Sequence, residues 1–142
     1  MKKASEDPLT KAEFEALSEF RFHIRRFERF SEDAVQACGI TPLQYLLLLH
    51  VKGFPGREHA SIGELAERLQ AKHHGVVALV TRCEEAGYVA RRADPADRRR
   101  VGVHLTAAGE RLLAHLAALH RTELRSLATV FPIARINAGD AS

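Results

Sequence analysis

Cysteine is scarce in this sequence, and long apolar runs are missing. The two cysteines, Cys38 and Cys83, are too few for a disulfide framework, so a reducing cytoplasm is the expected compartment. The longest apolar candidate is the four leucines from Leu46 to Leu49, far short of the ~20 residues that span a bilayer. The N-terminal residues lack the apolar segment of a signal peptide. We therefore expect a cytoplasmic protein that does not enter a membrane.

The motifs of common enzyme classes are also missing. The sequence contains no nucleophile elbow, no phosphate-binding P-loop and no glycine-rich dinucleotide fingerprint. Its eight histidines are scattered, and His115 and His120 are five residues apart, which places them on different faces of a helix. The sequence therefore predicts a protein without catalytic activity, cofactor or metal.

Positive charge is concentrated in one stretch of an otherwise balanced chain. The composition, 46% hydrophobic and 27% charged over 142 residues, is that of a globular protein that folds as a single unit. Between Gln70 and His104 there are seven lysines and arginines against four acidic residues, and the remaining 14 basic and 14 acidic residues cancel. A local excess of this kind suits a surface that binds phosphate.

Helical patterns account for the first half of the chain. Capping boxes at Thr10–Glu13, Thr41–Gln44 and Ser61–Glu64 predict three helix starts, and the helices end near residues 37, 52 and 69. Residues 53–59 are predicted as a loop. The first helix carries an apolar stripe that is long for the core of a small domain, so part of it could pack on a second subunit. The stripe consists of Phe14, Leu17, Phe20, Ile24, Phe27 and Phe30.

The second half changes from helical to strand periodicity. After a turn at residues 70–72, a helix with a buried side predicted at Val76, Leu79, Val80 and Cys83 runs to about Gly87. Alternating residues predict strands at 88–92 and 101–105, joined by a cationic turn. Thr106 caps a last helix to about residue 130. This order predicts a mainly α fold with a small β-hairpin, a winged helix-turn-helix domain at 41–105 between long helices at 10–38 and 106–131.

The helix after the turn is the predicted recognition helix, which enters the major groove of DNA. Its apolar side must face the core, so the other side chains are left for solvent or DNA. Histidines at its start can contact base edges, a glycine permits close approach, and small apolar residues can touch a thymine methyl. The basic residues suit phosphate contacts. The predicted contact residues are Lys72, His73, His74, Gly75, Val77, Ala78, Thr81 and Arg82.

The turn between the two strands is the second predicted DNA contact. Arg98, Arg99 and Arg100 are consecutive, and Asp97 can hold one of them in place. Guanidinium groups at a hairpin tip suit the narrow, electronegative minor groove. Without a polyanion, three adjacent like charges would lack an evident counterion.

Five segments carry a more specific pattern when taken in this order: residues 39–45, 62–69, 85–92, 94–99 and 105–110. They resemble the MarR family of winged helix-turn-helix transcriptional regulators. The resemblance implies a homodimer in which the long helices at 10–38 and 106–131 interlock. Such a dimer binds a pseudo-palindromic site on double-stranded DNA, commonly as a repressor released by a small lipophilic or phenolic effector. The resemblance also implies that Asp97 orients Arg99 for the minor groove. Lys72 and the His73–Gly75 run depart from the family pattern and affect the base preference.

Alternatives to a ligand-released regulator remain open at this point. Cys38 could sense oxidants, the histidines could assemble a metal sensor on folding, and a winged helix can also serve as a protein-interaction module without DNA. If a small effector binds, a pocket is predicted between the first two helices and the wing. Its predicted lining is Phe20, Ile24, Tyr45 and Leu49.

Overall fold

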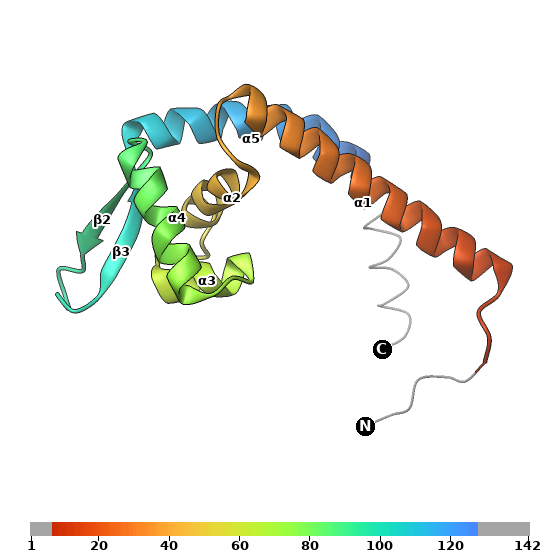
Figure 1. The fold of residues 1–142 in the computed structure, drawn as a ribbon, viewed down its shortest axis with the longest axis horizontal. Coiled ribbons are helices and arrows are strands. Elements are labelled where there is room, and N and C mark those ends of the chain that lie inside the picture. Colours follow the sequence, from red (N-terminus) through yellow and green to blue (C-terminus); the bar gives the residue numbers. More distant parts are fainter. Residues whose placement is uncertain (1–6, 128–142) are drawn as a thin grey trace. The chain divides into compact units, whose positions relative to one another are not determined.

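A computed structural model describes residues 7–127 of the chain. The chain divides into two compact units, one formed by residues up to Phe30 together with those from Thr122 onward, the other by Ser31–Arg121. The long helices α1 (Lys11–Ala37) and α5 (Ala107–Leu127) each contribute to both units, and every shorter element lies within Ser31–Arg121 (Figure 1). Residues 128–131 of the predicted last helix, and the tail beyond them, lie outside the described residues.

The three predicted capping boxes are confirmed. At the start of α1 the Glu13 amide donates to Thr10 Oγ1 at 3.2 Å, and Glu13 Oε1 accepts from the Thr10 amide at 3.3 Å. The same reciprocal pair of bonds opens α2 (Pro42–Lys52) and α3 (Ile62–Leu69). Each box satisfies amides that would otherwise lack a partner in the first helical turn, so three of the helix starts follow from local sequence.

Helices α3 and α4 (His73–Glu85) form the helix-turn-helix. Gln70 ends α3 in the left-handed conformation, with φ 52°, and its amide donates to the last turn of that helix. The chain then passes through Ala71 to Lys72, whose extended backbone starts α4. Val76, Leu79, Val80 and Cys83 are all buried, which confirms the predicted inner side of this helix.

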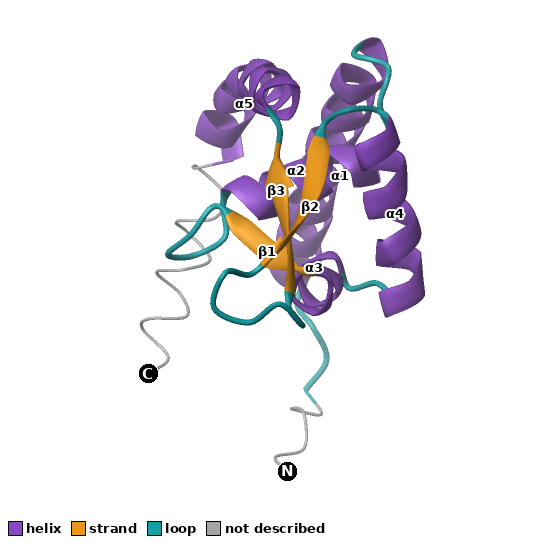
Figure 2. Cartoon of the chain, turned by 90° about the vertical axis from the view of Figure 1, so that its left-hand side faces the viewer, coloured by secondary structure: helices purple, strands orange, loops and turns teal. Residues whose placement is uncertain are grey.

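The sheet has three strands where the sequence predicted two. Strands β2 (Val89–Ala93) and β3 (Val101–Leu105) form the predicted hairpin, with β2 shifted by one residue. A short strand β1 (His59–Ser61) pairs with the other edge of β3, giving the antiparallel order β1-β3-β2 (Figure 2). The loop predicted at residues 53–59 was therefore wrong at its last residue, His59, which belongs to β1. Three residues are too few to show alternation, and their hydrogen-bonding partner lies far along the chain.

One apolar core supports the helix-turn-helix and the sheet within Ser31–Arg121. It combines buried side chains of α2, α3, α4, the three strands and the first turns of α5. Ala60 of β1 and Val103 of β3 are paired in the sheet and fully buried, so one face of the sheet closes this core. The opposite face carries His59 and His104, which are half-buried. The core thereby holds α4 and the wing, residues 89–105, on a common support.

One further finding concerns membranes. Within residues 7–127 no single helix is long and apolar enough to cross a bilayer; α1 and α2 pass that test only as a bent pair taken together, on length and composition.

Candidate nucleic-acid interface

The outer side of α4 is open to solvent at its first turn. His73, His74 and Gly75 are exposed, as is Lys72 before them. Among the described residues no side chain caps this end of α4, so the amides of its first turn face outward without a side-chain acceptor. Amides at a helix N-terminus bind phosphate oxygens because the helix dipole favours negative charge there. Lys72 adds a full positive charge at the same place.

Further along α4 the predicted contact residues differ in their environment. Val77, Ala78 and Arg82 are exposed, whereas Thr81 is half-buried. The Thr81 hydroxyl donates to the Val77 carbonyl at 3.0 Å and accepts from Arg91 Nη2 at 2.9 Å. Its hydrogen-bonding capacity is thus used within the chain. A direct role for Thr81 in DNA contact stays a prediction.

Arg91 joins β2 to α4 through contacts that the sequence pattern did not indicate. From β2 it reaches α4, where Nη1 pairs with Glu84 Oε1 at 2.8 Å and Nη2 also donates to the Val77 carbonyl at 3.3 Å. The second Glu84 oxygen accepts from the Arg91 amide at 3.0 Å. These bonds hold β2 against α4. Arg91 therefore belongs to the support of the interface, although by charge alone it counts toward the basic segment.

The wing tip presents its arginines to solvent. The Arg99 side chain is 93% exposed, yet its Nε donates to Asp97 Oδ1 at 3.3 Å and its amide donates to the same oxygen at 3.1 Å. The tip is closed by backbone bonds from the Arg100 amide to the Asp97 carbonyl and from the Asp94 amide to the Arg100 carbonyl. The predicted pairing of Asp97 with an arginine is therefore present, on the arginine that the resemblance indicated.

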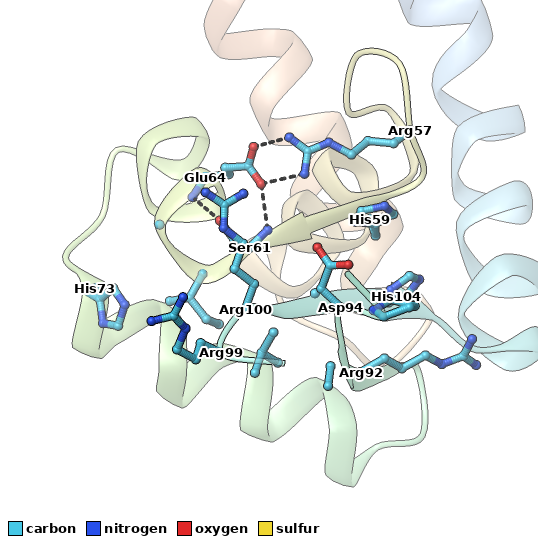
Figure 3. A pocket seen from close by; sticks show the side chains of 16 residues that line it. Arg57, His59, Ser61, Glu64, His73, Arg92, Asp94, Arg99, Arg100 and His104 are labelled. Carbon is cyan, nitrogen blue, oxygen red and sulfur yellow. Dashed lines mark hydrogen bonds and ion pairs between the residues drawn. The ribbon is translucent and has the colours of Figure 1, made fainter. Parts of the chain in front are cut away.

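The wing tip and the start of α4 share one surface. His73 and Arg99 both line a groove of about 610 Å³ that also includes the start of α3, and Figure 3 shows the Arg99 guanidinium directed toward His73. The two segments predicted to contact DNA are thus neighbours in space. Of the seven basic residues between 70 and 104, Arg92, Arg99 and Arg100 line this groove.

Neither the residues predicted for the effector pocket nor the cysteines line this groove. Phe20 and Ile24 belong to the unit that ends at Phe30, and Tyr45 and Leu49 to Ser31–Arg121, so a pocket that joins the four stays a prediction. Cys83 is buried, and desolvation raises its pKa to about 11, which disfavours the reactive thiolate. Cys38 is half-buried. In the described part of the chain no group of three or more His, Cys, Asp or Glu side chains is placed to hold a metal ion.

Comparison with known proteins identifies relatives of this chain. Residues 39–100 match the MarR family model. A Thauera aromatica protein, named as a transcriptional regulatory protein for the hcr operon, is 31% identical over 103 residues, 69% of this chain and 60% of that protein. The matched parts span 45%, 60% and 64% of the lengths of three curated relatives, less than two thirds of each.

Two solved structures share the fold at lower identity. AbsC, a MarR family transcriptional regulator from Streptomyces coelicolor, has a TM-score of 0.68 at 22% identity, covering 94% of this chain and 99% of AbsC. BpsR from Bordetella bronchiseptica, described with a mechanism for regulation of its DNA binding by 6-hydroxynicotinic acid, has a TM-score of 0.64 at 18% identity, covering 92% and 98%. These likenesses show the fold, and the match of residues 39–100 to the MarR family model, with the relative that is 31% identical, supports a MarR family transcriptional regulator.

Proposed function

We propose that this protein is a homodimeric transcription regulator that binds duplex DNA with α4 in the major groove and the wing in the minor groove. The observation that carries the proposal is the shared surface of His73 and Arg99. A helix start can read base edges while an adjacent hairpin arginine enters the minor groove beside it. A two-fold dimer would place two such surfaces on half-sites about one helical turn apart.

The apolar surface of α1 supports the dimer part of the proposal. Phe14, Leu17 and Phe22 are 52–55% exposed, and large apolar side chains grouped on one helix favour burial against a second subunit. The helices proposed for this role are those predicted at 10–38 and 106–131, of which residues up to 127 are described. We further propose that the regulator is a repressor released by a small effector, since relatives are named as transcriptional regulators and the DNA binding of BpsR is regulated by an aromatic acid.

Replacing Arg99 with alanine tests the wing. We expect duplex binding to weaken by ~1–3 kcal/mol, because a guanidinium contact in the minor groove is lost, and we expect no change in folding, because the side chain is 93% exposed. The measurement is fluorescence anisotropy with a duplex selected from random sequences, at a stated salt concentration. Arg111→Ala, at an exposed position on α5, is the matched control. Wild-type affinity in the Arg99 variant would rule out the wing assignment.

Replacing Gly75 with alanine tests the close approach of α4 to DNA. No described atom lies within 4 Å of a Cβ added at Gly75, so the free protein accepts the methyl group and should gain ~0.5–1 kcal/mol of helix stability. If the backbone lies against a base or phosphate, the same methyl group should weaken duplex binding about tenfold or more, since a fitted interface does not accept added volume. Thermal unfolding and anisotropy measure the two effects. Equal duplex affinity would place the first turn of α4 away from DNA.

A further inference from the structure

The groove beside the wing has a composition that suits a small ligand. Its volume of about 610 Å³ lies within the range of small-molecule sites. Its walls come from the loop before β1, the outer face of the sheet, the start of α3 and the wing (Figure 3). Ile62, Ala93, Pro95 and Val101 supply apolar surface, and charged and polar side chains line the rest of the walls. This groove contains none of the residues predicted for an effector pocket.

Positive charge exceeds negative charge in the groove. Four arginines line it against two carboxylates, those of Glu64 and Asp94. Arg57 binds both oxygens of Glu64, so this pair is neutralised. Within residues 7–127 neither Arg92 nor Arg100 has a carboxylate partner. Figure 3 shows Arg100 on one side of the groove, His104 on the other and the Asp94 carboxylate between them. Arg92 and Arg100 therefore provide positive charge at two separate places in the groove, without a carboxylate partner among the described residues.

Two histidines on the outer face of the sheet form part of the floor of the groove. The rings of His59 and His104, paired residues of β1 and β3, stack with centroids 4.8 Å apart. A Cβ added at Gly102 would lie 3.2 Å from His104 Nε2 and 3.5 Å from His59 Nδ1, so the two ring nitrogens converge above the glycine. Burial, then His59 and Arg92, lower the pKa of His104. A nearby anion would offset the two electrostatic causes and supply an acceptor for the ring nitrogens.

We propose that this groove binds a small dianion, with one oxyanion group toward Arg100 and the other toward Arg92 and the His59–His104 pair. The separation of the two cationic places favours a ligand with two anionic groups over a single one. Phosphate and carboxylate groups share this chemistry, and arginine binds both through paired N–H donors. Arg99 and Arg100 line the groove and also form the wing tip, so an occupied groove competes with DNA for these arginines. This last step rests on the proposed function.

Titration with inorganic pyrophosphate, without DNA, tests the site. The ring signals of His59 and His104 in NMR spectra should move with saturable binding, measured in parallel by calorimetry. Arg92→Gln and His104→Gln should each weaken binding about tenfold, the loss typical of one hydrogen bond to a charged group. Asp94→Asn should instead tighten binding, because it removes the like charge while its side-chain oxygen can still accept from the Ala96 amide as Asp94 does at 2.8 Å.

Arg82→Gln is the matched control, since it removes the same charge from α4 outside the groove. Its pyrophosphate affinity should equal that of the wild type. Absence of saturable binding, or equal losses in the Arg82 and Arg92 variants, would overturn the site, because the effect would then be one of net charge only. These measurements need no DNA, so they decide the site even if the proposed DNA binding fails.

A second titration tests competition with DNA. At constant ionic strength, pyrophosphate should weaken duplex binding by the wild type, and Arg92→Gln should reduce this effect while retaining duplex affinity. Arg92→Gln could instead lose as much affinity for the duplex as it loses for pyrophosphate. That result would show that the groove binds DNA phosphates and would overturn a separate small-ligand site. Duplex binding that is unaffected by saturating pyrophosphate would overturn the competition.

Discussion

Replacement of Gly109 with alanine is expected to destabilise the winged helix domain by about 3 kcal/mol, the upper part of the range for overpacking. A Cβ at this position would lie 2.1 Å from the carbonyl oxygen of Tyr88. The carbonyl belongs to the backbone and the backbone fixes the position of the Cβ, so neither can rotate away. The domain would have to separate the start of α5 from the segment before β2. A drop of roughly 10 °C in the midpoint of thermal unfolding is the expected readout.

The reason for this close approach is the junction around Thr106. The Thr106 amide donates to the Tyr88 carbonyl at 3.0 Å, and its hydroxyl donates to the Gly87 carbonyl at 2.6 Å while accepting from the Gly109 amide at 3.1 Å. One threonine thus caps α5 and joins it to the turn after α4. The methyl group of an alanine at 109 would push this junction apart, and the cap would be strained with it.

Gly63→Ala is the matched control for Gly109. Gly63 also lies in a helix, but the nearest described atom to its added Cβ is Ser61 Oγ at 4.0 Å. Alanine should therefore raise stability there by ~0.5–1 kcal/mol through its higher helix propensity. Opposite signs at the two glycines are the expected pattern. A Gly109 variant as stable as the wild type would contradict the close packing of α5 on Tyr88.

Replacement of His120 with alanine is the second change with a large expected effect, a loss of about 3 kcal/mol of stability. His120 is 4% exposed. Its Nδ1 lies 2.7 Å from the Leu116 carbonyl and its Nε2 lies 2.8 Å from Ser31 Oγ. A carbonyl can only accept, so Nδ1 donates to it, and in the neutral ring Nε2 accepts from the serine hydroxyl. The ring also stacks on Tyr45 with centroids 4.9 Å apart.

The alanine variant would leave a cavity beside Tyr45 and remove both side-chain bonds. The bond to Ser31 joins α5 to the end of α1, and the stacking on Tyr45 joins α5 to α2. We therefore expect a lower unfolding free energy in urea without a change in the outer side of α4. His115→Ala, at an exposed position on the same helix, should stay within about 0.5 kcal/mol of the wild type. Similar stability of the two variants would mean that the His120 contacts contribute little to folding.

Arg91 illustrates why a basic segment cannot be equated with a DNA contact. Its charge contributes to the excess between residues 70 and 104, yet the structure pairs it with Glu84 and Thr81. Nothing in the spacing of residues 81, 84 and 91 indicates this contact, since it depends on how β2 crosses α4. A pair between Asp97 and a neighbouring arginine, in contrast, was predicted correctly because the residues lie within one turn, and the resemblance indicated Arg99 as the partner.

The groove beside the wing could not be predicted from the sequence for the same reason, because it depends on contacts between distant segments. His59 and His104 are far apart in the chain and come together only because β1 pairs with β3. A strand of three residues leaves no periodic signal, so neither the third strand nor the face that it completes could be predicted. The helices could be, because capping boxes and apolar stripes act over three or four residues.

The sequence by itself determined the helix starts, the buried side of α4, the order of a winged helix and the pairing of Asp97 with an adjacent arginine. All of these rest on atoms within one turn of each other or on a repeat that follows the helix period. The tertiary structure decided that Arg91 pairs with Glu84 and that His59 stacks on His104. It also decided that the wing tip shares a surface with the start of α4. Those contacts join distant segments, and only the packing of the sheet and helices on a common core sets their distances.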